Sequence, residues 1–199
     1  MRAVIGIGLV GLCGLLACTP GGGGGTGPAR ESQILGGALR ISPPQGYCID
    51  RAASQDHDDS AVVLMGRCTD AAPVAPAVIS LTVGEAGTSA VLAAGGQALA
   101  DYFTSAPGRA AVARSGRASD VRVQEAFGKG AEGGGAFLLH LADRGVGEYW
   151  RAVVGVRGRL VTVSVTPPED QPLPPEAGRD LLEQVLAGLI RANAVKTTP

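Results

Sequence analysis

Residues 149–166 read YWRAVVGVRGRLVTVSVT, and they carry the strongest hairpin signal in the chain. Tyr149 to Val156 and Leu160 to Thr166 are two runs rich in the residues that strands favour. Arg157-Gly158 lies between them, where glycine tolerates a positive φ. In the second run the valines face one way and the Thr and Ser residues face the other. The stretch therefore predicts an antiparallel hairpin with one buried face.

The residues on either side of the hairpin extend the same pattern. Upstream, Val121, Val123 and Phe127 predict one face of a strand, and Ala136 to Leu141 predicts the next strand. Downstream, Glu176 to Ala192 carries leucine and valine at helical spacing, which predicts an amphipathic helix.

Earlier segments predict a mixed set of strands and helices. We expect strands at Leu39 to Ser42, Gly46 to Ile49, Ala61 to Met65 and Val78 to Val83, a polar loop over 50–60, a helix over Val91 to Ser105 and helical turns over Pro107 to Gly116. The whole order predicts an α+β fold, in which helices pack on an antiparallel β-sheet. Over residues 35–193 this element order is similar to the PsbP-like fold, a resemblance that transfers no functional residue.

The first residues have the pattern of a secretory signal: Arg2, then an almost wholly apolar run from Ala3 to Ala17. The run is shorter than the ~20 apolar residues that cross a bilayer. Leu15-Leu16-Ala17-Cys18 resembles a bacterial lipobox, which implies that residues 1–17 are removed and that Cys18 receives lipid. The alternative is an ordinary signal peptide that is cut nearby, with Cys18 incidental.

The lipobox resemblance also predicts where the protein resides. Two or more acyl chains anchor a protein stably, so we expect a lipid-anchored domain on the periplasmic side of the cell envelope. Thr19 follows the cysteine, and the absence of Asp there favours the outer membrane in lipoproteins of the enteric type.

Glycine-rich sequence separates the anchor from the domain. Residues 18–34 include Gly21 to Gly25 and predict a flexible tether. Residues 35–193 have the length of a single domain, and residues 194–199 form a polar tail. The net charge of −1 indicates no nucleic-acid partner.

Two cysteines remain within the domain, Cys48 and Cys68. In a compartment that permits disulfides, this pair predicts a structural bridge that joins two neighbouring strands. A metal site needs more ligands, and a redox pair usually has the shorter C-x-x-C spacing.

Residues 41–50, ISPPQGYCID, look like a motif of small alphaproteobacterial envelope lipoproteins, some of which carry a cation transport ATPase label. The chain has no D-K-T-G phosphorylation motif and no G-x-x-x-x-G-K-[ST] loop. We therefore expect no ATPase activity.

Charged residues suggest two candidate sites. Asp56, His57, Asp58 and Asp59 are weak candidates for a metal site; the alternative is a solvated loop tip. Residues 109–159 carry eight Arg and Lys129 against five acidic residues, a balance of 9 − 5 = +4.

Arginine suits bidentate contact with carboxylate or phosphate. Arg109, Arg114, Arg117 and Arg151 could therefore form a face for an anionic partner or for lipid headgroups, and a solvated basic surface is the alternative.

Catalytic motifs are absent from the sequence. It has two histidines, no G-x-S-x-G elbow and no H-E-x-x-H, and we expect the strand residue His140 to be structural. The leading expectation is therefore a non-catalytic accessory or binding domain without a cofactor, working alone or in an envelope protein complex. A small-ligand or metal-binding lipoprotein using residues 56–59 is the second hypothesis, and an envelope hydrolase is the third.

Overall fold

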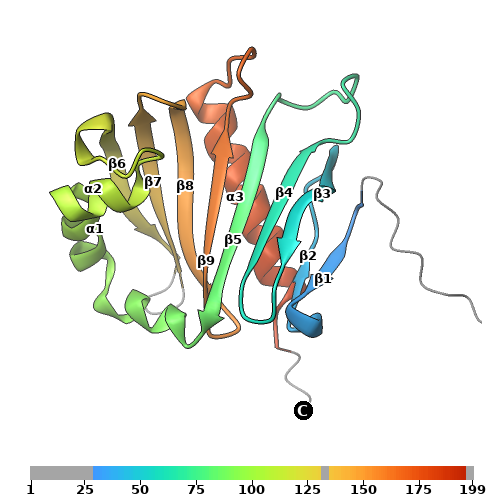
Figure 1. The fold of residues 1–199 in the computed structure, drawn as a ribbon, viewed down its shortest axis with the longest axis horizontal. Helices are drawn as coiled ribbons and strands as arrows, with labels where there is room; N and C mark the ends of the chain where they lie inside the picture. The colour runs from blue at the N-terminus through green and yellow to red at the C-terminus, as the bar shows by residue number, and fades with distance from the viewer. Residues whose placement is uncertain (1–28, 131–134, 196–199) are drawn as a thin grey trace, which may run out of the picture.

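The computed structural model describes residues 29–130 and 135–195 (Figure 1). Its elements are β1 (Ser32–Ile34), η1 (Leu35–Gly37), β2 (Leu39–Ile41), β3 (Tyr47–Asp56), β4 (Ala61–Arg67), β5 (Val78–Ala86), η2 (Thr88–Ala94), α1 (Gly96–Thr104), α2 (Ala106–Val112), η3 (Ala118–Asp120), β6 (Val121–Lys129), β7 (Ala136–Asp143), β8 (Gly147–Val156), β9 (Arg159–Thr166) and α3 (Pro175–Ala192). The lipidation expected at Cys18 and the signal over 1–17 lie outside the described residues. Within the described ranges, no helix is long and apolar enough to cross a bilayer.

The hairpin predicted at residues 149–166 forms the centre of a seven-stranded sheet. The strand order is β3-β4-β5-β9-β8-β7-β6, and all neighbours are antiparallel. Arg157 and Gly158 have φ values of 52° and 76°, the two positive values of a type I′ turn. The predicted α+β fold with an antiparallel sheet is confirmed, and the PsbP-like element order stays a prediction.

Helix α3 covers one face of the sheet and creates the larger core (Figure 1). Val161, Val163 and Val165 of β9 are fully buried on this face, as their alternation predicts. The stripe of α3 that packs on β8 and β9 includes Leu182 and Val185. Burying one such side chain contributes about 1.5–3 kcal/mol, so this face determines the position of α3.

The segments η2, α1 and α2 cover only part of the opposite face (Figure 1). Leu99 and Phe103 of α1 pack there with Phe137 of β7, and the two phenyl rings stack with centroids 5.7 Å apart. The helix predicted over 91–105 is divided at Gly95, whose φ of 84° and ψ of 165° end η2 before α1 begins.

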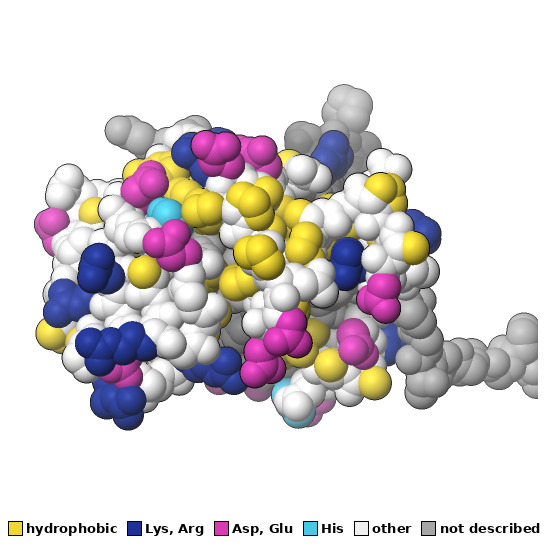
Figure 2. All heavy atoms as spheres, turned by 90° about the horizontal axis from the view of Figure 1, so that it is seen from above, with side chains coloured by type: hydrophobic (Ala, Val, Ile, Leu, Met, Phe, Trp, Pro, Cys, Tyr) yellow, Lys and Arg dark blue, Asp and Glu magenta, His cyan; other side chains and the backbone are white. Residues whose placement is uncertain are grey.

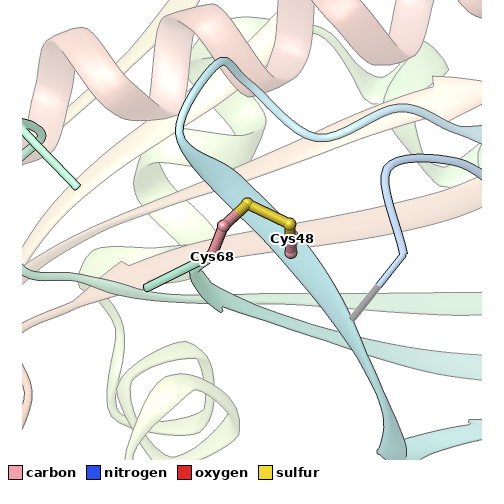
Figure 3. Close-up of a disulfide and its surroundings, with 2 residues drawn as sticks. All are labelled: Cys48 and Cys68. Carbon is pink, nitrogen blue, oxygen red and sulfur yellow. A yellow bond between two sulfur atoms is a disulfide. The ribbon is translucent and has the colours of Figure 1, made fainter. Parts of the chain in front are cut away.

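A disulfide joins Cys48 at the start of β3 to Cys68, just after β4 (Figure 3). The two Cα atoms are 4.9 Å apart, and Cys48 pairs with Gly66 in the β3–β4 ladder. The backbone N–H of Cys68 donates to the carbonyl of Gly46 at 2.9 Å. The predicted disulfide is confirmed, and it joins strands that backbone hydrogen bonds also hold together.

The prediction that Val121, Val123 and Phe127 share one face is wrong. The β6–β7 register shifts between Val123 and Glu125, so one extra residue enters β6 and inverts the alternation after it. Val121 and Val123 pack in the α1 cluster, whereas Phe127 lies on the α3 side, with its ring centroid 6.3 Å from that of Trp150.

The polar loop predicted over 50–60 is mostly strand. β3 continues to Asp56, with a register shift between Asp50 and Gln55. The Asp50 carboxylate accepts the N–H groups of two of the intervening residues, so a side chain satisfies backbone donors where the ladder is interrupted. β3 is an edge strand that is exposed over this stretch, and so it needs no apolar alternation.

The predicted tether over 18–34 extends too far towards the domain. Ser32–Ile34 form β1, which pairs with β2, and Ala29 pairs with Ile49 of β3. Ile34 is buried in the larger core, so the folded part begins before residue 35.

Candidate ligand-binding site

An apolar pocket of about 490 Å³ lies between the helical layer and the sheet. Its walls come from η2, α1 and α2, and its floor comes from β8 and β9. The residues that line it include Val91, Ala98, Leu99, Tyr102, Phe103, Val112, Arg151, Val153 and Thr162. This volume is within the range of small-molecule sites, which are usually concave and apolar with a few polar groups.

Two glycines allow the helical layer to approach the sheet and to fold on itself. A Cβ on Gly155 of β8 would lie 3.2 Å from the Cβ of Ser89, so glycine lets η2 lie close to the strand. A Cβ on Gly108 of α2 would clash with the backbone at the end of α1, so glycine also permits the tight α1–α2 corner.

The corner between α1 and α2 is capped by a side chain. The hydroxyl of Ser105 accepts the N–H of Gly108 at 3.2 Å, as an N-cap residue does. Helix α2 ends at Val112 and not near Gly116, so the helical turns predicted over 107–116 are shorter than expected.

Apolar side chains remain exposed at the mouth of the pocket. Val91 of η2 is 52% exposed and Tyr102 of α1 is 46% exposed. Deeper in the pocket, Leu99, Phe103 and Val153 are buried. The helical layer therefore leaves an open apolar hollow beside the smaller core.

Arg151 is the charged residue that lines this pocket. Its Nε donates to Ser164 Oγ at 2.9 Å, and its Nη1 donates to the carbonyl of Val112 at 3.2 Å. Its guanidinium carbon lies 5.5 Å from the ring centroid of Tyr149. Neighbouring strand β9 and helix α2 thus hold a half-buried cation in a defined position.

Tyr149, two residues before Arg151 in β8, supports the same arrangement. Its hydroxyl donates to the carbonyl of Val112 at 3.2 Å, the acceptor that it shares with Arg151. Burial raises the pKa of Tyr149, the positive charge of Arg151 lowers it, and the carboxylate of Asp143 raises it further. Tyr149 therefore stays neutral near pH 7 and acts as a hydrogen-bond donor.

The other three predicted arginines lie on or after α2, and Figure 2 shows Lys and Arg side chains gathered at that end of the molecule. Arg109 is half-buried and its guanidinium donates to the carbonyls of Thr104 and Ala118. Arg114 and Arg117 are exposed. The structure therefore separates Arg151, at the floor of the pocket, from the outer three.

Two of the outer arginines, Arg114 and Arg117, have an acidic residue beside them. Arg117 Nη2 lies 2.6 Å from the carboxylate of Asp120, and the backbone N–H of Arg114 donates to Asp143 at 2.9 Å. A hydrogen bond from Ser115 is the main cause that lowers the pKa of Asp120; burial opposes it, and bonds from Arg117 and Ser119 add to it. Part of the predicted basic face is thus neutralised within the protein.

The acidic loop does not form a metal site among the described residues. There, no group of three or more His, Cys, Asp or Glu side chains is placed to hold a metal ion. Asp56 instead accepts the backbone N–H of Leu35 at 3.0 Å, and the backbone N–H of His57 closes a turn onto the carbonyl of Ser60 at 2.9 Å. Asp58 and Asp59 are exposed at the tip of that turn.

His140 lies on the α3 side of the sheet and outside the pocket. Its ring stacks on Trp150 with centroids 4.6 Å apart, and its Nδ1 is 3.6 Å from Glu125. Arg179 of α3 lies over the rings of Trp150 and Phe127, at 5.5 Å and 5.3 Å. These contacts agree with the expected structural role.

The sequence identifies Arg151 but misses the apolar walls around it. Compared with known protein families, the chain matches no family model, and no curated protein matches it.

Proposed function

We propose that this chain is a lipid-anchored binding domain of the cell envelope and that the pocket beneath α1 is its binding site. The observation that carries the proposal is a hollow with apolar walls, an exposed apolar mouth and one positioned guanidinium. This combination is typical of small-molecule sites. It favours the ligand-binding hypothesis, with the site moved from the acidic loop to the pocket.

A non-catalytic role agrees with the placement of the histidines. His57 belongs to an exposed turn, and His140 is stacked on Trp150, away from the pocket. General acid–base chemistry needs a proton-transferring group within reach of the ligand. The charged group that lines the pocket is Arg151, which stays protonated and so serves binding.

The lipid anchor remains part of the proposal and rests on the resemblance of Leu15 to Cys18 to a lipobox. We expect Cys18→Ser to abolish acylation and to release the domain from the membrane fraction, because the acyl chains are the proposed attachment. Intact mass and membrane fractionation measure both effects. A Cys18→Ser variant that stays fully membrane-bound contradicts the anchor. In the anchored protein, the exposed Arg114 is proposed to contact anionic headgroups or an anionic envelope partner, whereas Arg117 is paired with Asp120.

The pocket itself is tested by filling it. Ala98 is an exposed residue of α1 that lines the pocket, so Ala98→Phe places a ring in its mouth. Ala187→Phe is the matched control, an exposed alanine of α3 that does not line this pocket. N-phenyl-1-naphthylamine, an uncharged apolar dye whose fluorescence rises in apolar surroundings, serves as the probe.

We expect the dye to bind the folded wild-type protein with one site. Ala98→Phe should weaken that binding at least tenfold, and Ala187→Phe should leave it unchanged. Far-UV circular dichroism of all three proteins shows whether the fold is kept. Equal binding by the wild type and Ala98→Phe, or no binding by the wild type, contradicts the proposed site.

A further inference from the structure

We infer that the pocket takes a small single-tailed amphiphile with one anionic group, such as an aliphatic or aromatic carboxylate, and that Arg151 binds the anion. This inference rests on the proposed function, because it assigns a ligand class to the same pocket. It also orients the bound ligand, whose charged group lies at the floor of the pocket and whose apolar tail extends towards the mouth.

The positive charge of Arg151 has no carboxylate beside it among the described residues. Within the described residues, its guanidinium forms no ion pair with a carboxylate, and its partners are a hydroxyl, a carbonyl and an aromatic ring. By contrast, Arg117 at the surface lies 2.6 Å from Asp120. Cations removed from water are normally paired with an anion. A half-buried, unpaired guanidinium in an apolar pocket is therefore complementary to an anionic ligand.

Two hydrogen bonds orient the guanidinium of Arg151. The group has five N–H donors, of which Nε and one on Nη1 are used by Ser164 and Val112. Those bonds hold the planar group from β9 and α2, so its remaining donors are held ready for a ligand. A planar fork of this kind matches the two oxygens of a carboxylate.

The walls of the pocket are apolar. Leu99, Phe103, Val112 and Val153 line the same pocket as Arg151 with apolar side chains, and they are buried. An apolar wall excludes water and strengthens a charge–charge contact. The same walls favour a hydrocarbon or aromatic tail over a free inorganic anion.

The volume of the pocket and its exposed mouth limit the size and the orientation of the ligand. About 490 Å³ is in the range of sites for drug-sized ligands, which favours one tail over the two tails of a membrane phospholipid. Val91 and Tyr102 stay exposed at the mouth, where a tail would cover them. A ligand with this orientation would cover the apolar surface that the free protein exposes.

Titration calorimetry with decanoate and with 1-decanol tests the inference, because the two probes share a tail and differ in charge. The proteins are the wild type, Arg151→Gln, Arg151→Lys and the control Arg122→Gln, an exposed arginine that does not line this pocket. We expect decanoate to bind one site and to bind at least tenfold more tightly than decanol, which is about 1.4 kcal/mol. Arg151→Gln should remove that preference, Arg151→Lys should restore part of it, and Arg122→Gln should keep it.

The outcomes separate this inference from the proposed function. If decanol binds as tightly as decanoate and Arg151→Gln changes neither, the anionic class is wrong while the pocket remains a binding site. If Arg151→Gln weakens binding to phosphatidylglycerol vesicles and decanoate does not bind, the anion belongs to a membrane lipid and the inference is overturned. If neither probe binds the folded wild type and the dye does not bind, both proposals fail.

Discussion

Removing the Cys48–Cys68 disulfide should lower the free energy of unfolding by about 3 kcal/mol. The bridge closes a loop with a sequence separation of 20. In the loop-entropy model, a cross-link over a loop of this length removes about 3 kcal/mol of chain entropy from the unfolded state. For domains of about 150–250 residues, each kcal/mol shifts Tm by roughly 2–4 °C, so Tm should fall by roughly 6–12 °C.

The structure indicates that this effect arises mainly in the unfolded state. Cys48 pairs with Gly66 in the β3–β4 ladder, and the N–H of Cys68 donates to the carbonyl of Gly46. These backbone bonds do not need the sulfur atoms, so the hairpin should persist after the bridge is removed. The unfolded chain, in contrast, becomes more extended, and the urea m-value should rise.

The assay is urea denaturation of the wild type, the reduced wild type and the Cys48→Ala/Cys68→Ala variant at 25 °C. Reduction keeps both side chains, so agreement between the reduced protein and the double variant separates the cross-link from any change in packing. A loss below about 1 kcal/mol in both proteins, with an unchanged m-value, would refute the loop-entropy reasoning.

Three further predictions follow from the packing and from the carboxylates. Gly108→Ala should cost about 3 kcal/mol or more, because its Cβ would clash with a backbone carbonyl oxygen of α1; thermal unfolding measures this. Leu182→Ala should cost about 2–5 kcal/mol in urea, because Leu182 is fully buried, whereas Ile190→Ala on the exposed side of α3 should stay within about 0.5 kcal/mol. The hydrogen bond from Ser115 is the main cause that lowers the pKa of Asp120 below its usual value, so Asp120 stabilises the fold above the unfolded pKa of about 3.9 and loses this effect as pH falls through its lower folded pKa. The stability difference between the wild type and Asp120→Asn should therefore shrink between pH 6 and pH 3, and a constant difference would contradict the role of the ionised carboxylate.

Local sequence patterns were enough where one face of an element is buried and its period is uninterrupted. The alternation over residues 160–166 and the helical spacing over 176–192 each predict a buried face that the structure confirms. The same reasoning failed at Phe127, because a β-bulge shifts the alternation of side chains in β6 and no residue type in the sequence marks its position. It failed again over 50–60, where an exposed edge strand has no buried face to produce a pattern.

The sequence also identified Arg151 as a candidate for anion contact, for a reason that the structure revises. The positive charge balance of residues 109–159 predicts one basic face that joins Arg151 with Arg109, Arg114 and Arg117. The structure places Arg151 on the floor of a pocket and the other three around or after α2. The signal that could have separated them is the strand alternation, which places Arg151 in the middle of a β-strand and therefore between apolar neighbours.

Patterns in the sequence are enough to predict the central hairpin, the amphipathic helix α3, the disulfide pair and the α+β class. These features follow from local period, turn chemistry and cysteine count, which act over short distances along the chain. The apolar hollow that α1, α2 and η2 leave over β8 and β9 arises from tertiary packing. The same packing places Arg151 on the floor of the hollow without a carboxylate partner among the described residues. That arrangement joins segments from residue 91 to residue 162, and it depends on how far a short helical layer covers the sheet, which no local pattern encodes.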